Sequence, residues 1–200
     1  MEYSLRKLYG GAITIQLPTT LLDASKFREV PDSQEVFVNG GTNTTNYQEL
    51  NKNDSIIIDL LERAEEDIDV ALKTHIQDIS EANGVGANWF LAFSETVPDA
   101  KKIAIVLEEA KKWGKDSKGD VLVMVIGLIR LKEVSTDVVI TANVPIGDDE
   151  KEVEGLHKLV EHRYHHADDD NLAFQRIKIA EAVVLKILET FHVDNWGLFG

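Results

Sequence analysis

The stretch VLVMVIGLIRL, residues 121–131, is followed after a short segment by a second apolar stretch, TDVVITANVP, residues 136–145. Both are long and rich in β-branched and aliphatic residues, which favour strands. The intervening segment KEVS, residues 132–135, is short enough to close a hairpin. The two stretches therefore predict a long antiparallel hairpin, and the hairpin in turn predicts a fold built on a sheet.

Further strand patterns lie on the N-terminal side of this hairpin. GGAITIQLP (10–18) is opened by two glycines and closed by a proline, QEVFVN (34–39) alternates, and residues 56–61 are β-rich. KIAIVLEEAKKW (102–113) predicts another strand, with a helix as the alternative. Between the first two strands, Asp23 or Ser25 is expected to cap a single helical turn.

Two segments have helical periodicity. Residues 65–84 carry apolar side chains at helical spacing behind three acidic residues that favour a helix N-terminus, and residues 173–191 form an amphipathic pattern. The tail after residue 191 is apolar enough to pack back on the fold. These patterns predict the α+β class, with a central, mostly antiparallel sheet flanked by helices, in a single domain spanning residues 1–200.

The composition restricts the class of partner. The chain of 200 residues has a formal net charge of −14 and no cysteine, so neither disulfides nor thiolate chemistry are available. A surface this acidic repels nucleic acids and anionic lipid, and no apolar run approaches the roughly 20 residues of a membrane-spanning helix. The acidic surface favours a basic protein partner. The alternative is that the negative charge serves solubility alone.

Motifs for covalent or metal chemistry are weak. GVGANW (84–89) lacks the third glycine of a dinucleotide-binding turn, and neither a phosphate-binding loop nor a nucleophile elbow occurs. On a helix, His162 and His166 would share a face and could hold a metal, which would suit a metal-dependent hydrolase. The alternative is a solvated, charged segment. We expect no metal and no cofactor.

The stretch SIIIDLLE (55–62) poses the main question, because Asp59 interrupts an aliphatic run and Glu62 closes it. A buried, unpaired carboxylate costs several kcal/mol. One interpretation is that the strand runs through Ile58 and then bends, so that both carboxylates reach the rim as exposed acids. The alternative is that Asp59 pairs with Arg63 or caps a turn.

Several stretches together resemble the Ran guanine nucleotide release factor family, also called the Mog family, in its fungal branch. The resemblance covers most of the chain; residues 40–54, 83–101 and 146–170 diverge. The stretches that carry it are LYGGAITIQLP (8–18), DASKFREVPDSQEVFVN (23–39), SIIIDLLE (55–62), KKWGK (111–115), LIRLKEVSTDVVITANVP (128–145) and FHVDNWGLF (191–199).

The resemblance implies a PsbP-like, Mog-like sandwich that binds the GTPase Ran and displaces its nucleotide in nuclear protein import. It implies that the protein is not an enzyme. It further implies a monomer that resides in the nucleus, with a cytoplasmic pool. The alternative is a scaffold or binding module of the same fold without exchange activity.

The resemblance also implies partner-binding residues. Asp59 and Glu62 match the acidic positions that serve Ran binding, and Asp23, Asp32 and Glu35 lie in the other matching acidic stretch. On this interpretation, Asp59→Lys and Glu62→Lys are each expected to weaken Ran binding while the fold stays nearly intact.

Overall fold

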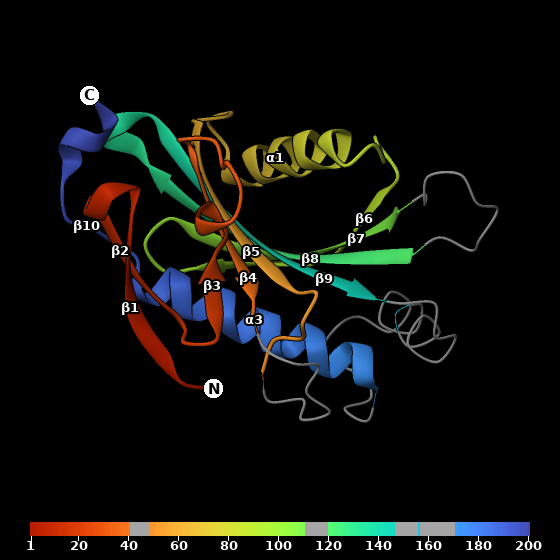
Figure 1. Cartoon of the computed structure of the whole chain (residues 1–200). Coiled ribbons are helices and arrows are strands. Elements are labelled where there is room, and N and C mark those ends of the chain that lie inside the picture. Colours follow the sequence, from red (N-terminus) through yellow and green to blue (C-terminus); the bar gives the residue numbers. More distant parts are fainter. Residues whose placement is uncertain (41–48, 111–119, 147–155, 157–170) are drawn as a thin grey trace.

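The computed structural model describes residues 1–40, 49–110, 120–146, 156 and 171–200. Its centre is a seven-stranded sheet in which all neighbouring strands are antiparallel (Figure 1). In spatial order, the strands are β3 (Leu21–Asp23), β4 (Gln34–Asn39), β5 (Ser55–Glu62), β9 (Thr136–Ile146), β8 (Asp120–Leu131), β7 (Lys101–Ala110) and β6 (Trp89–Val97).

A smaller sheet packs beside the large one. It is three-stranded, antiparallel and ordered β1 (Tyr3–Leu8), β2 (Ile13–Pro18) and β10 (His192–Val193). In the described part of the chain, four short 3₁₀ helices connect or end these elements: η1 (Tyr9–Gly11), η2 (Ala24–Lys26), η3 (Lys132–Val134) and η5 (Trp196–Phe199).

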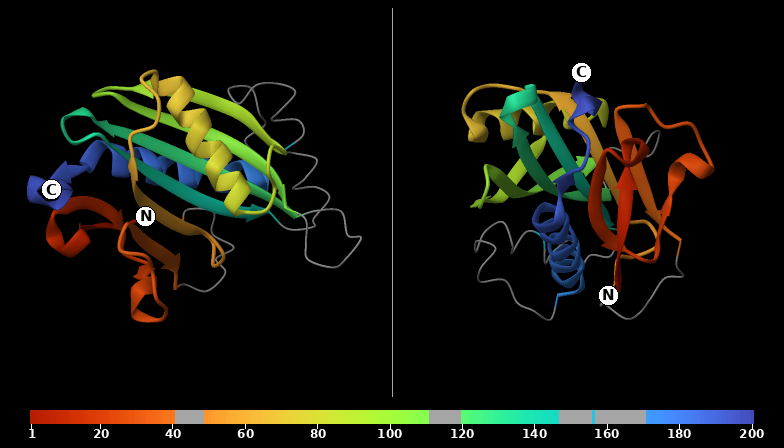
Figure 2. Two further views of the ribbon diagram at one scale, coloured as in Figure 1. Left: turned by 90° about the horizontal axis from the view of Figure 1, so that it is seen from above. Right: turned by 90° about the vertical axis from the view of Figure 1, so that its left-hand side faces the viewer.

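Two α-helices cover opposite faces of the large sheet, as the two views of Figure 2 show. Helix α1 (Ile68–Ala82) buries Leu72 and Ile76 against one face, and helix α3 (Leu172–Thr190) packs on the other face together with β2. Each helix has a polar N-cap, because the side chains of Asp67 and Asn171 accept hydrogen bonds from the first-turn N–H groups. The predicted class, an antiparallel sheet flanked by helices, is confirmed.

The predicted central hairpin is confirmed by β8 and β9. The two strands pair from Val121↔Ile146 down to Leu131↔Thr136, and η3 closes them at a left-handed Ser135. The strand at 34–39, the helical turn capped by Asp23 and the packed tail are confirmed as well. The strand predicted at 102–113 is confirmed up to Ala110, and residues 111–113 lie outside the described ranges. No helix within the described ranges is both long enough and apolar enough to cross a membrane.

Gly127 lies in the middle of β8, against α3. A Cβ placed on Gly127 would meet Val184 Cγ1 at 2.9 Å and Leu188 Cδ2 at 3.1 Å. Both partners are fully buried, so neither can move into solvent. A glycine in a central strand is otherwise unfavourable, and here it makes room for the helix.

We therefore expect Gly127→Ala to lower the free energy of unfolding by about 1–3 kcal/mol through overpacking. The measurement is urea denaturation. In the double variant Gly127→Ala, Val184→Ala, the new methyl group takes space left by the valine. The double variant should therefore lose less unfolding free energy than the sum of the losses of the two single variants. Full additivity would show that the close approach does not limit packing.

Candidate functional site

The strand that carries the predicted acids is longer than the sequence indicated. β5 pairs with β9 along its whole length, up to Glu62↔Thr136, whereas its pairing with β4 ends at Asp59↔Gln34. The expected bend after Ile58 is therefore wrong. Because side chains alternate along an unbroken strand, Asp59 and Glu62 point to opposite faces of the sheet.

Asp59 is buried on the α1 side of the sheet, with 8% of its surface exposed. Burial raises the pKa of Asp59 above its usual range, and a hydrogen bond from Gln34 and the nearby His75 counteract only part of this effect. The expectation of an exposed acid at the rim is wrong for Asp59. The alternative partner, Arg63, instead pairs with Glu66 at 2.5 Å.

The burial of Asp59 has a consequence for stability. Its folded-state pKa lies above the unfolded value of about 3.9, so the folded protein binds more protons than the unfolded chain between these two pKa values. The free energy of unfolding therefore falls as the pH rises from the unfolded pKa through the folded one. We expect Asp59→Asn to raise the melting temperature at pH 7, and the gain to shrink toward pH 4. Exposed Asp78→Asn is the control and should show no such trend. A lower melting temperature of Asp59→Asn at pH 7 would contradict this prediction.

Glu62 is exposed at the end of β5 and lies on a groove of about 520 Å³. The groove lies between the end of β5, the β8–β9 turn and η5. The backbone N–H of the next residue, Arg63, donates to the Ser135 carbonyl at 2.9 Å, so the chain on both sides of Glu62 is fixed to β9. Glu62 is thus an exposed carboxylate on a rigid strand end, as the sequence indicated.

The other three predicted acids lie on or beside the neighbouring strands, with different surroundings. Asp32 is exposed in the turn before β4. Asp23 ends β3, and its carboxylate accepts from the N–H and hydroxyl of Ser25, at 2.8 and 2.6 Å. Glu35 on β4 is half-buried, and burial, with the nearby Asp23, raises its pKa.

Tyr9 ties the small sheet to the strands that carry the acids. Its backbone N–H donates to Glu35 Oε1 at 2.5 Å, and its hydroxyl donates to the Ile58 and Ser33 carbonyls at 2.8 and 3.2 Å. Tyr9 adopts a positive φ of 49°, which few non-glycine residues do. Glu35 therefore has a structural contact within the fold.

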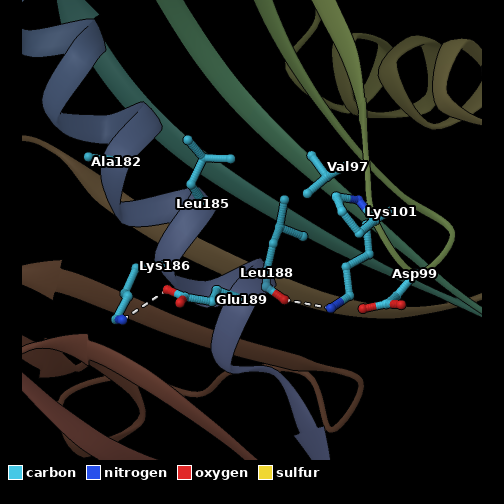
Figure 3. A pocket seen from close by; sticks show the side chains of 9 residues that line it. Val97, Asp99, Lys101, Ala182, Leu185, Lys186, Leu188 and Glu189 are labelled. Carbon is cyan, nitrogen blue, oxygen red and sulfur yellow. Dashed lines mark hydrogen bonds and ion pairs between the residues drawn. The ribbon is translucent and has the colours of Figure 1, made fainter.

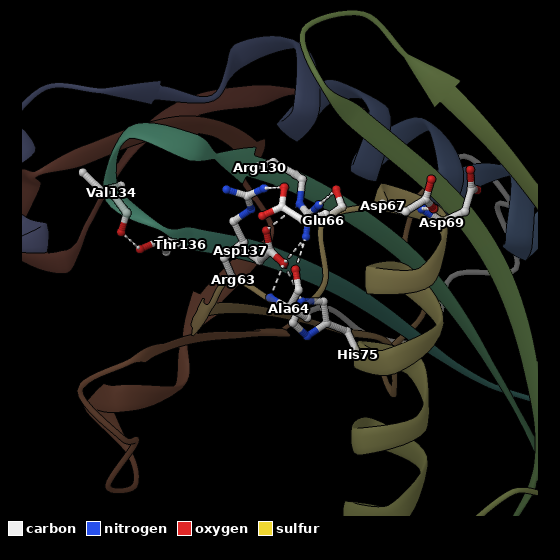
Figure 4. Close-up of polar contacts among 10 residues, drawn as sticks. All are labelled: Arg63, Ala64, Glu66, Asp67, Asp69, His75, Arg130, Val134, Thr136 and Asp137. Atoms are coloured by element: carbon white, nitrogen blue, oxygen red, sulfur yellow. Dashed lines mark hydrogen bonds and ion pairs between the residues drawn. The ribbon is translucent and has the colours of Figure 1, made fainter.

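A buried polar network, which the sequence analysis missed, holds the chain just after Glu62 (Figure 4). Asp137 is fully buried; its carboxylate contacts His75 Nε2 at 2.8 Å and accepts from Arg130 Nε at 3.1 Å and from the Ala64 N–H at 3.1 Å. Arg130 also donates to the carbonyls of Ala64 and Glu66. Burial alone would raise the pKa of Asp137, but these hydrogen bonds outweigh it and hold the pKa below its usual value.

The network could have been found from the hairpin register. Once the β8–β9 turn is placed at residues 132–135, Arg130 and Asp137 become cross-strand neighbours of opposite charge. Its role is positional, because it fixes the segment between β5 and α1 and so the strand end that presents Glu62.

A second groove, of about 540 Å³, lies between α3 and the turn from β6 to β7 (Figure 3). Two of its charged groups are occupied within the chain: Lys101 donates to the Leu188 carbonyl at 2.7 Å, and Lys186 pairs with Glu189 at 2.9 Å. It lies on the β6–β7 side of the sheet, away from the predicted acids, so the Glu62 groove is the stronger candidate site.

The fold and the site define an α+β domain with an exposed carboxylate, Glu62, beside a groove at the end of a central strand. Residues 6–145 match the family model described as "Ran-interacting Mog1 protein". The chain belongs to this Mog1 family.

Relatives and solved structures agree with this assignment. The chain is 42% identical over 147 residues to the nuclear import protein MOG1 of Saccharomyces cerevisiae, which covers 72% of this chain and 67% of the relative. It is 31% identical to the Ran guanine nucleotide release factor of Danio rerio, over 70% of this chain and 78% of the relative. The crystal structure of the S. cerevisiae Ran-binding protein Mog1p superposes with a TM-score of 0.81 at 34% identity, covering both chains fully.

Proposed function

We propose that this chain binds the GTPase Ran and promotes release of its guanine nucleotide, as a factor in nuclear protein import. The observation that carries the proposal is the 42% identity to the yeast nuclear import protein MOG1, together with relatives that are named Ran guanine nucleotide release factors. The acidic character of the chain, with a formal net charge of −14, suits a basic partner surface.

The proposed action is that of a binding factor and requires no covalent chemistry. A protein that binds the empty GTPase more tightly than the nucleotide-loaded form must weaken nucleotide binding by the same factor. The five acids Asp23, Asp32, Glu35, Asp59 and Glu62 are the proposed partner-binding set, and Glu62 is the most accessible of those that the structure places on the strands of the large sheet.

Asp59 has a second reason to be in this set. A carboxylate that is buried with a raised pKa is unfavourable for folding, and such groups concentrate at functional sites. Glu35 shares the raised pKa on the adjacent strand. The two carboxylates lie on opposite faces of the sheet, because Asp59 pairs with Gln34 and Glu35 pairs with Ile58.

The proposal extends to the whole molecule. Residues 1–200 act as a single Ran-binding domain and as a monomer, in the nucleus with a cytoplasmic pool, and bind neither nucleic acid nor membrane. Gel filtration coupled to light scattering tests the monomer, and imaging of a tagged protein tests the location.

The central experiment measures the release of labelled GTP from purified Ran as this chain is added. Accelerated release that saturates with concentration is expected. Binding to Ran with unchanged release at saturation would contradict the exchange function and leave a scaffold of the same fold. A pulldown with Ran in its GTP-bound, GDP-bound and empty states shows which state is preferred, and we expect the empty state.

A further inference from the structure

The groove beside Glu62 has a mixed apolar and charged lining. Its walls combine the apolar side chains of Leu60, Val134, Leu198 and Phe199 with the exposed carboxylate of Glu62. It opens to solvent, and its volume of about 520 Å³ exceeds what one long side chain occupies. A mixed lining of this kind fits a ligand group that has an apolar stem and a charged end.

The charges at the groove indicate the sign of that end. Arg63 also lines the groove, but it is paired with Glu66 at 2.5 Å and makes no ion pair with Glu62 in the described structure. The other polar lining residues, Ser135 and Thr136, are uncharged. Glu62 is therefore a carboxylate without a cation among the described residues, on a chain with a formal net charge of −14.

An aromatic pair stands at the same end of the molecule. The rings of Trp196 and Phe199 lie 5.9 Å apart in η5, and Trp196 is 47% exposed. Aromatic side chains of this kind are enriched among the anchors of protein interfaces. Their π faces also attract cations.

We propose that this groove accepts a basic side chain, lysine or arginine, from the surface of the GTPase partner. Its methylene stem packs against Leu60, Leu198 and Phe199, and its cationic end pairs with Glu62. The inference rests on the proposed function, since it names the group that the partner supplies to this site. It assigns a binding role to the β8–β9 turn and to η5, neither of which contributes a residue to the proposed acidic set.

The test fills the groove without touching the carboxylate. Thr136 is the cross-strand neighbour of Glu62 and lines the groove, and an aromatic residue suits a strand position. We expect Thr136→Trp and Glu62→Gln each to weaken the affinity for nucleotide-free Ran by about tenfold or more in calorimetric titration. Because both changes remove the same bound side chain, the double variant should lose little more than the stronger single variant.

Matched controls separate the groove from general effects. Thr96→Trp adds the same bulk at an exposed position of edge strand β6, and Glu133→Gln removes an equal charge from the β8–β9 turn; both residues lie outside the groove lining. Both variants should bind within about twofold of the parent, because they leave the groove and its carboxylate in place. All variants are first checked for an unchanged thermal melt.

A second pair of variants serves if Thr136→Trp does not fold. Ser135 is exposed at the groove, so Ser135→Lys places a cation beside Glu62 within the chain, and Ser135→Gln adds similar length without charge. Ser135→Lys should weaken Ran binding more than Ser135→Gln does, because only the lysine supplies a cation to Glu62.

The outcomes distinguish the two proposals. Folded Thr136→Trp or Ser135→Lys that binds Ran like the parent would overturn the groove proposal while Ran binding itself stands, and so would fully additive losses in the double variant. A parent chain that binds Ran in none of its nucleotide states would overturn the proposed function and the groove proposal together.

Discussion

Asp137→Ala is expected to lower the free energy of unfolding by about 3–5 kcal/mol, the typical cost of removing one partner from a buried ion pair. Asp137 and Arg130 are 0% and 6% exposed, so the guanidinium left behind remains out of solvent. The loss also leaves His75 and the Ala64 N–H without their carboxylate partner. Guanidinium chloride denaturation of the parent and the variant measures the difference.

The effect should depend on pH in a defined direction. The folded-state pKa of Asp137 is lowered, so its stabilisation is present above the unfolded pKa of about 3.9 and is lost as the pH falls through the folded value. The difference between parent and variant should therefore shrink in acid. Asp78→Ala removes an exposed acid on α1 and should stay within about 0.5 kcal/mol of the parent. If Asp137→Ala lowered the free energy of unfolding by as little, the buried network would not stabilise the fold as argued.

The strands that the sequence predicted are those whose residue pattern is regular. The β8–β9 hairpin, β4 and β7 have uninterrupted β-rich runs, so local preference and tertiary pairing agree. β6 was missed because its register shifts between Leu91 and Phe93, which breaks the alternation of side chains, and it is an edge strand with many exposed residues. β1 was missed for a related reason, since its mixed sequence lies at the edge of the small sheet.

The site was predicted less completely than the fold, because its geometry depends on distant partners. The sequence could place Glu62 at a strand end, but the groups that act on the buried Asp59, Gln34 from β4 and His75 from α1, are distant in the sequence. The contact of Glu35 with the Tyr9 N–H depends on the positive φ of Tyr9, which no pattern in the sequence indicates. The histidines at 157–166 lie outside the described residues, so the metal-site alternative stays untested.

The expectation for Asp59→Lys changes as a result. A lysine at a position that is 8% exposed would place a charge against buried neighbours, so we now expect this variant to destabilise the fold. A weakened affinity of Asp59→Lys for Ran would then report unfolding as well as binding. Asp59→Asn, which keeps the side-chain shape, is the appropriate test of its contribution to the interface.

Glu62→Lys is the charge reversal that the structure favours as a test of binding. Glu62 is exposed on a rigid strand end, so the melting temperature should stay close to that of the parent. At the interface, the change replaces an attraction by a repulsion, and loss of a desolvated charge pair typically costs about 2–5 kcal/mol of affinity. We therefore expect Ran binding to weaken by roughly 30-fold or more, as measured by calorimetric titration.

The control for Glu62→Lys is the same reversal at the opposite side of the same sheet. Glu95 is exposed on edge strand β6, so Glu95→Lys changes the net charge equally without touching the proposed site. If long-range attraction alone set the affinity, the two variants would weaken binding alike, and both effects would vanish at high salt. If Glu62 makes a local contact, its variant should keep a larger loss at high salt. Equal behaviour of Glu62→Lys and Glu95→Lys would show that the acids at the end of β5 do not form the Ran interface.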